Sequence, residues 1–165
     1  MNPTFTLPVE LSPLTCREVV SQAWYRATTG EPLLNSASDI AERWLNKGGD
    51  IYRRATRFIL WESLSIATMS VVTTVSGQVP FRLLGRQLRL LAVMQYLGGW
   101  DLHQKTTQYR ALEVLYGSGA VAFPARWRSR SLYNVVKDFW RTYRAAQLFH
   151  LLYVAPAFPP PAPLR

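Results

Sequence analysis

His103 and Asp101 are the neighbouring residues in this sequence whose types best suit proton transfer. A carboxylate close to an imidazole is a combination used in general acid and base catalysis. The pair, however, lies directly after the two glycines of the segment YLGGWDLH. An aspartate in that position more simply caps the next turn and leaves the histidine in solvent. We therefore expect Asp101 to be a capping residue and not part of a catalytic site.

The sequence supports metal coordination and nucleophilic catalysis no better than it supports acid and base catalysis. His150 is the only other histidine and Cys16 is the only cysteine, whereas a zinc site normally takes several such ligands. The sequence contains no HExxH, P-loop, GxSxG or glycine-rich dinucleotide motif. The sequence therefore predicts a protein that is not an enzyme and that uses neither a cofactor nor a metal.

Arginine is the residue type whose spacing suggests binding, because its planar guanidinium group pairs with both oxygens of a phosphate or carboxylate. One group opens an apolar helix, a second recurs on one side of a later helix, and a third surrounds a tryptophan in a loop. Tryptophan among arginines suits a lipid interface or a stacked base, and the alternative for each group is an ordinary solvated face. We predict contacts with anionic lipid or a partner at Arg53, Arg54, Arg57, Arg82, Arg86, Arg89, Arg126, Trp127, Arg128 and Arg130.

The charge of the chain is also unevenly distributed. The formal net charge is +9, with −2 in residues 1–50 and +11 in residues 51–165. Such a surplus favours an anionic partner, which is a phospholipid surface, a nucleic acid or an acidic protein surface. No RNP sequence or zinc finger supports nucleic acid, so we rank it behind the other two.

Most of the chain carries sequence patterns typical of helices, so helices must position the arginine groups. Capping residues, helical spacing of apolar residues and terminal glycines predict an all-α fold, a single domain of five to six helices with extended, proline-rich ends. We predict helices at 16–29, from Ser36 or Ser38 to Gly48, from Asp50 through 75, and at 80–97, 106–116 and 131–153. These helices make up a helical domain at 15–153. An extended arm at 1–14 precedes it, and a proline-rich tail at 154–165 follows it.

Residues 58–75 (FILWESLSIATMSVVTTV) contain one charged residue, Glu62. A helix of this length rises about 27 Å, slightly less than the hydrocarbon thickness of about 30 Å. It is a borderline membrane span, and a buried core helix explains it at least as well because six serines and threonines dilute it. A short strand in the β-branched run 71–75 is the third interpretation.

The order of features from Asp39 to Gly117 resembles the EcsC-like family of helical proteins. The similar segments are DIAERWLNKGG, RFILWESLSIAT, GQVPFRLLGRQLRLLAVMQYLGGWDLHQ and YRALEVLYGSG, with Pro80, the Arg86 and Gln87 pair and YLGGWDLH as the most specific elements. The resemblance implies an all-helical protein that associates with membrane, and it transfers no catalytic residue. The chain departs from the family in carrying only Gly77 before the proline.

Together these observations predict a non-enzymatic, membrane-associated accessory or structural subunit of a membrane-bound complex, with larger protein subunits and anionic phospholipid as partners. Tryptophan, tyrosine and arginine dominate interface energetics, and the chain is rich in all three. The alternatives are an EcsC-like peripheral protein acting alone at anionic lipid and, third, a basic nucleic-acid-binding protein. The lone cysteine and the absence of a signal-peptide pattern predict a reducing interior compartment, at the cytoplasmic face of a membrane or in a mitochondrion, and not secretion.

Overall fold

A computed structural model describes residues 13–32, 34–76, 81–117, 132–160 and 162, and most of these residues are helical. The prediction of an all-α single domain is confirmed for this part of the chain. Its helices are α1 (Pro13–Thr29), α2 (Ala37–Lys47), α3 (Ile51–Ser76), α4 (Phe81–Leu97), α5 (Lys105–Tyr116) and α6 (Leu132–Phe149), followed by the π-helix η2 (His150–Val154) and the short α7 (Ala155–Ala157).

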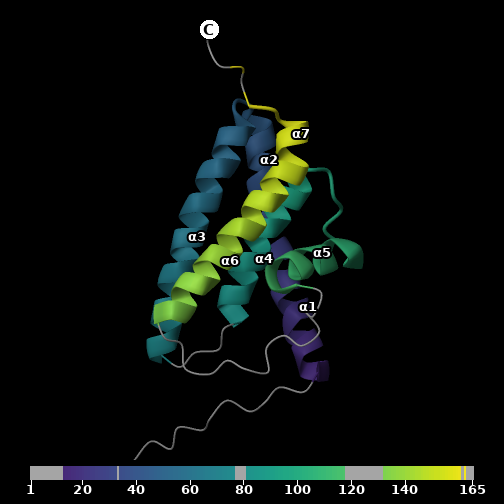
Figure 1. Ribbon diagram of the computed structural model, residues 1–165. Helices are drawn as coiled ribbons and strands as arrows, with labels where there is room; N and C mark the ends of the chain where they lie inside the picture. The colour runs from purple at the N-terminus through teal and green to yellow at the C-terminus, as the bar shows by residue number, and fades with distance from the viewer. Residues whose placement is uncertain (1–12, 33, 77–80, 118–131, 161, 163–165) are drawn as a thin grey trace, which may run out of the picture.

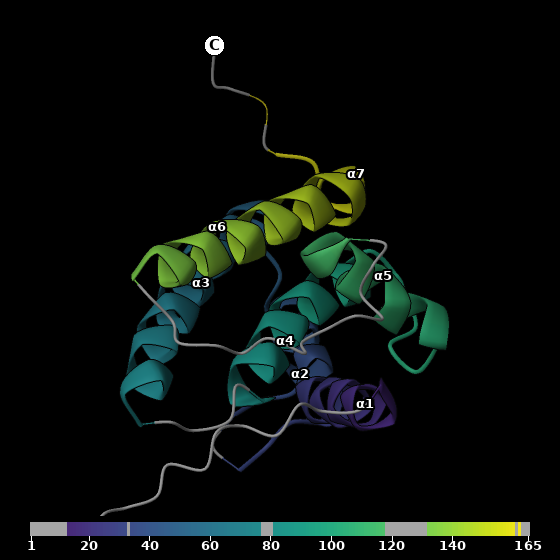
Figure 2. The same cartoon turned by 60° about the horizontal axis from the view of Figure 1, so that its bottom comes forward.

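Helix α4 is the centre of the fold. It packs against α1, α2, α3, α5, α6 and η2, and Figure 2 shows it surrounded by the other helices. A helix that is apolar around most of its circumference is expected to be buried. Its buried apolar residues are Leu83, Leu84, Leu88, Leu90, Leu91, Ala92, Val93, Met94 and Leu97.

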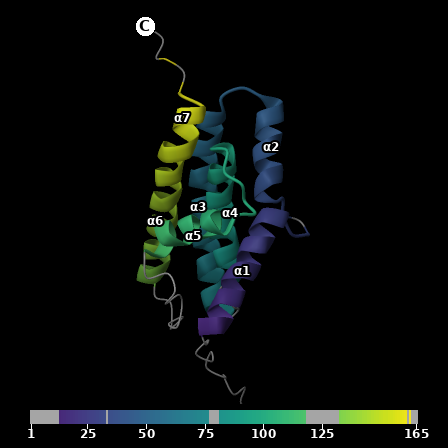
Figure 3. The same cartoon turned by 90° about the vertical axis from the view of Figure 1, so that its right-hand side faces the viewer.

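The remaining helices lie on either side of α4. Figure 3 shows α1 and α2 on one side of α3 and α4, and α6 with α7 on the other. Helices α3 and α6 pack against each other along their lengths and run in opposite directions (Figure 1). Helix α3 therefore lies at the outside of the fold, in contact with both α4 and α6.

The predicted caps set the helix boundaries. Ser36 accepts a hydrogen bond from the backbone N–H of Asp39 at 3.0 Å, and the Asp39 carboxylate accepts one from the backbone N–H of Ser36 at 3.3 Å. Asp50 likewise accepts from the backbone N–H of Arg53 at 2.9 Å. These contacts satisfy donors that a helix start leaves unpaired. The predicted starts of α2 and α3 are therefore confirmed.

The turn between α1 and α2 requires a glycine at Gly30. Its φ of +86° lies in the left-handed region, and a Cβ there would approach the backbone nitrogen of Ser36 to 3.0 Å. The turn closes with two hydrogen bonds of 2.9 Å between the backbones of Glu31 and Leu34. Arg26 of α1 pairs with Glu31, and Arg89 of α4 donates a hydrogen bond to the carbonyl of Asn35, so the turn contacts both helices.

Both predicted ends of the helical domain need correction. Helix α1 begins at Pro13 and not at residue 15 or 16, because proline is well suited to the first helical position, where no N–H is needed. At the other end, helix continues through η2 and α7 to Ala157 and includes Pro156. The wider π turn immediately before Pro156 moves the proline ring away from the carbonyl that an α-helix would place against it. The rest of the predicted arm lies outside the described residues.

Candidate functional site

The predicted arginine group at the start of α3 is only partly on the surface. Arg53 is exposed and pairs with Asp50 at 3.1 Å, and Arg57 is also exposed. Arg54 is half-buried and donates from Nη1 to the carbonyl of Trp44 at 3.4 Å. Arg53 and Arg57 are thus placed to meet an external anion, whereas Arg54 joins α3 to α2.

Arg86 and Arg89 of α4 lie largely in the interior. Arg86 donates from Nε and Nη2 to the two carboxylate oxygens of Glu62 at 3.0 and 3.2 Å, and Arg89 donates from Nη2 to Glu62 Oε1. The exposed fractions of these side chains are 19% for Arg86, 8% for Arg89 and 9% for Glu62. Arg86 Nη1 also donates to Ser65 Oγ at 2.9 Å. We call Glu62, Arg86 and Arg89 the buried triad.

The buried triad changes the interpretation of the predicted arginine stripe. A charge in the interior is stable only where an opposite charge and hydrogen bonds replace its water shell, and Glu62 supplies this for both arginines. Arg86 and Arg89 therefore do not form the exposed contact row that the sequence predicts. The side chain of Arg82 lies outside the described residues, as do Arg126, Trp127, Arg128 and Arg130.

Helix α3 presents apolar side chains outward at the level of the buried triad. Glu62 and Ser63 are buried, whereas Leu60, Trp61 and Leu64 are 44%, 68% and 43% exposed. Residues 58–75 begin with buried apolar residues such as Ile59, so the expected core face is present. Leu60, Trp61 and Leu64 thus place three large apolar side chains on the outward side of α3, where a solvated helix usually carries polar residues. Within the described residues, no helix combines the length and hydropathy that a membrane span requires.

Helix α6 and η2 carry a second exposed apolar row. Trp140 is 50% exposed, and Leu148, Leu151 and Leu152 are 44%, 58% and 54% exposed. The guanidinium carbon of Arg144 lies 6.0 Å from the centre of the Trp140 ring, within reach of a cation–π interaction. The row therefore combines large apolar side chains with a cation.

We treat these two rows together as one candidate surface. Eight of the eleven large apolar residues that are exposed in the described part of the chain lie on α3, α6 or η2. Since α3 and α6 are neighbours, the rows lie on adjacent helices (Figure 1). We call this set the α3–α6 face. It comprises Leu60, Trp61, Leu64, Val136, Trp140, Leu148, Leu151 and Leu152.

The two histidines lie in different surroundings. Asp101 accepts a hydrogen bond from the backbone N–H of His103 at 2.9 Å, and both residues are exposed, which confirms the predicted capping role. His150 is 2% exposed in η2. Its Nε2 lies 3.3 Å from the carbonyl oxygen of Tyr52. Burial lowers the pKa of His150, although this hydrogen bond opposes the shift.

Neither metal geometry nor similarity to known proteins identifies a function. The described residues hold no group of three or more histidine, cysteine, aspartate or glutamate side chains arranged to bind a metal ion. Comparison with protein-family models, with curated proteins and with solved structures finds no match to this chain. The EcsC-like resemblance therefore stays a prediction.

Proposed function

We propose that this protein is a non-enzymatic helical subunit of a membrane-bound complex and that it docks on a larger protein subunit through the α3–α6 face. The observation that carries the proposal is the concentration of exposed apolar side chains on these two neighbouring helices. Soluble proteins scatter such residues singly, and a contiguous group marks a surface that another molecule covers.

The arrangement of α3 gives the proposal its physical basis. This helix buries the carboxylate of Glu62 and exposes Trp61 and Leu64 on the other side. Covering these apolar side chains would gain about 25 cal/mol for each Å² removed from water. Tryptophan at 68% exposure offers the largest gain of this kind, and tryptophan is the residue type most enriched at interface hot spots.

A second candidate function is binding to anionic phospholipid without a protein partner. It is favoured by the position of Arg144 against the exposed Trp140 ring and by exposed Arg53, Arg57 and Lys137 on the same two helices. Surface cations add about 1 kcal/mol each to membrane binding near an anionic leaflet. The two candidates share a face and differ in what covers it.

One experiment distinguishes them. Membranes from the native host are extracted with mild detergent and analysed on native gels, for the wild type and for the double variant Trp61→Glu with Trp140→Glu. A subunit migrates with a larger assembly, and the variant is released as a monomer. The matched control is Tyr25→Glu with Tyr109→Glu, since these aromatics are 66% and 64% exposed on α1 and α5, and we expect it to remain in the assembly.

Vesicle sedimentation tests the second candidate, direct binding to anionic phospholipid. Direct action at lipid predicts that the purified wild type binds vesicles containing phosphatidylglycerol and is released from them in high salt. It also predicts that native gels show no larger assembly. Migration as a free monomer with no vesicle binding contradicts both candidates. A salt-sensitive shift with RNA or DNA, without vesicle binding, supports a nucleic-acid-binding function instead.

A further inference from the structure

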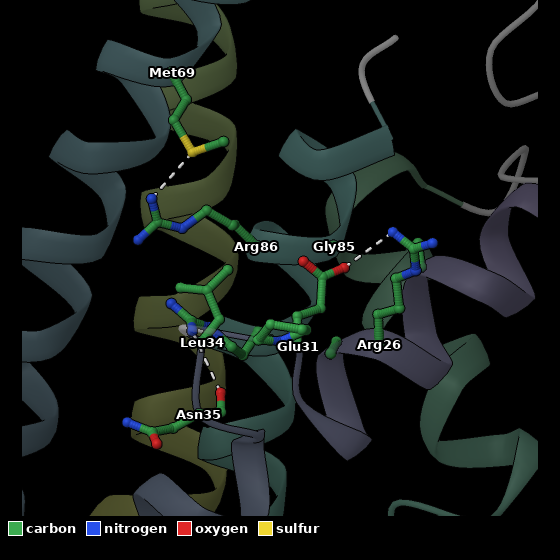
Figure 4. A pocket seen from close by; sticks show the side chains of 11 residues that line it. Arg26, Glu31, Leu34, Asn35, Met69, Gly85 and Arg86 are labelled. Atoms are coloured by element: carbon green, nitrogen blue, oxygen red, sulfur yellow. Dashed lines mark hydrogen bonds and ion pairs between the residues drawn. The ribbon is translucent and has the colours of Figure 1, made fainter.

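A pocket of about 350 Å³ lies between α1, the turn after it, α3 and α4. Figure 4 shows Arg86 and Met69 on one side of this pocket and the Arg26 and Glu31 pair on the other. The volume falls within the range of about 300–1,000 Å³ that small-molecule sites occupy. Much of the wall is apolar. The apolar lining residues are Ala23, Ala27, Pro32, Leu34 and Met69.

Among the described residues, the charged groups that line the pocket and their ion-pair partners sum to one net positive charge. Arg26, Arg86, Arg89 and Glu31 line it. Arg26 pairs with Glu31 at 3.1 Å, and the single carboxylate of Glu62 pairs with both Arg86 and Arg89. Two guanidinium groups thus share one carboxylate at the pocket wall. One further negative charge from a ligand would complete the balance.

Arg89 also has hydrogen-bonding capacity that the protein does not use. Its Nε is buried and has no hydrogen-bond partner in the described part of the chain, and the residue as a whole is 7% exposed. The guanidinium group offers five N–H donors, whereas Glu62 and the carbonyl of Asn35, at 3.4 Å, are its acceptors here. Because Nε is itself covered by protein atoms, a ligand oxygen would instead meet the guanidinium group at Nη1, where the 3.4 Å contact with the Asn35 carbonyl is a weak hydrogen bond that a charged acceptor could improve.

Gly85 keeps the space between these groups open. It lies inside α4 and lines the pocket, where alanine would favour the helix. A Cβ at Gly85 would meet only the carbonyl oxygen of Ala23, at 3.9 Å, which is an ordinary contact. The packing of α1 on α4 therefore does not require glycine, and a longer side chain here would extend into the pocket.

We propose that this pocket binds a small monocarboxylate with a short apolar chain, a ligand class that the docking function does not involve. The carboxylate would accept hydrogen bonds at the Arg89 end, and the chain would lie against the apolar wall. A monoanion matches the one unbalanced charge. The dianion of inorganic phosphate would exceed that charge and would leave the apolar wall exposed to water.

Isothermal titration of the full-length protein tests the ligand class with octanoate, octanol, octylamine and inorganic phosphate. We expect octanoate to bind about tenfold more tightly than octanol, because charge-assisted hydrogen bonds form only with the carboxylate. Octylamine should not bind. Failure of octanoate to bind, or equal affinity for octanol, octylamine or phosphate, overturns the proposal.

Two further measurements locate the ligand. Gly85→Leu should weaken octanoate binding at least about tenfold by filling the pocket, whereas Gly85→Ala, which keeps most of the space, should retain binding. Unchanged affinity in a folded Gly85→Leu variant would show that the ligand binds elsewhere. Should that variant not fold, the ¹⁵N-labelled wild type decides the question. Octanoate should shift the Nε–H signal of Arg89 and leave that of exposed Arg53 in place, and the reverse pattern contradicts the site.

Discussion

Arg86 of α4 contacts Glu62 of α3 at two points, with Nε and Nη2 at 3.0 and 3.2 Å from the two carboxylate oxygens. This contact fixes the rotation of α3 about its axis. Leu60 and Leu64 are each about 160° around the helix from Glu62, because successive helical residues turn by about 100°. Burying the carboxylate therefore turns these leucines outward. The buried triad and the α3–α6 face are two consequences of one helix orientation.

The first prediction concerns the charge balance of the buried triad. Glu62→Gln leaves Arg86 and Arg89 buried without a counter-charge, and we expect it to lower the free energy of unfolding by about 3–5 kcal/mol. Guanidinium chloride unfolding followed by circular dichroism measures the change. Arg26→Gln is the control, because it breaks the exposed Arg26 and Glu31 pair and should cost less than about 1 kcal/mol.

Replacing all members of the triad gives a complementary test. Glu62→Met with Arg86→Met and Arg89→Met removes every buried charge, and such replacements are often neutral or stabilising. A loss of stability for Glu62→Gln that is no greater than that for Arg26→Gln would show that the triad does not hold α3 against α4.

The sequence predicts the helices well because their boundaries depend on local contacts. Ser36, Asp50 and the glycines after α2 and α4 act within a few residues of themselves, so their types and spacing are sufficient. The π-helix before Pro156 was not predicted, since a widened turn leaves no residue pattern of its own. Its position directly before Pro156 is a property of the folded backbone.

The placement of Arg86 and Arg89 depends on contacts between helices, and the sequence prediction of an exposed stripe failed for this pair. Spacing alone gives the side of a helix that they share, but not the neighbour that this side faces. One signal was present. Glu62 is the single charged residue in 58–75, and a lone carboxylate in an apolar helix is expected to find a buried cation.

The second prediction compares two glycines of the central helix region. A Cβ at Gly98 would lie 2.5 Å from the Cβ of Tyr153 in η2, so Gly98→Ala forces α4 and η2 apart and should cost about 1–3 kcal/mol. Gly85→Ala meets no such obstacle and should stabilise the protein by about 0.5–1 kcal/mol. Thermal unfolding of both variants checks the contrast, and equal effects of the two substitutions would be inconsistent with this packing.

The third prediction is a pH dependence caused by His150. Burial lowers its pKa below the ordinary value of 6.5, so between the two values the unfolded chain binds a proton that the folded protein does not. Stability should therefore fall as pH decreases below about 6.5 and level off once the pH is below the folded-state pKa. His150→Gln should flatten this dependence in urea unfolding measured from pH 8 to pH 5. The control is His103→Gln, which removes an exposed imidazole. This variant should keep the same dependence of the free energy of unfolding on pH as the wild type.

The final prediction separates side chains that stabilise the fold from those available for docking. Trp24 is 7% exposed and donates from Nε1 to the carbonyl of Leu102 at 3.0 Å, so Trp24→Phe leaves that carbonyl unpaired and should cost about 1–3 kcal/mol. Trp61 is 68% exposed, and Trp61→Gln should change the free energy of unfolding by less than about 0.5 kcal/mol. Urea unfolding of the isolated protein measures both values. A loss for Trp61→Gln as large as that for Trp24→Phe would mean that this tryptophan serves the fold, and the α3–α6 face would then lose its most exposed docking residue.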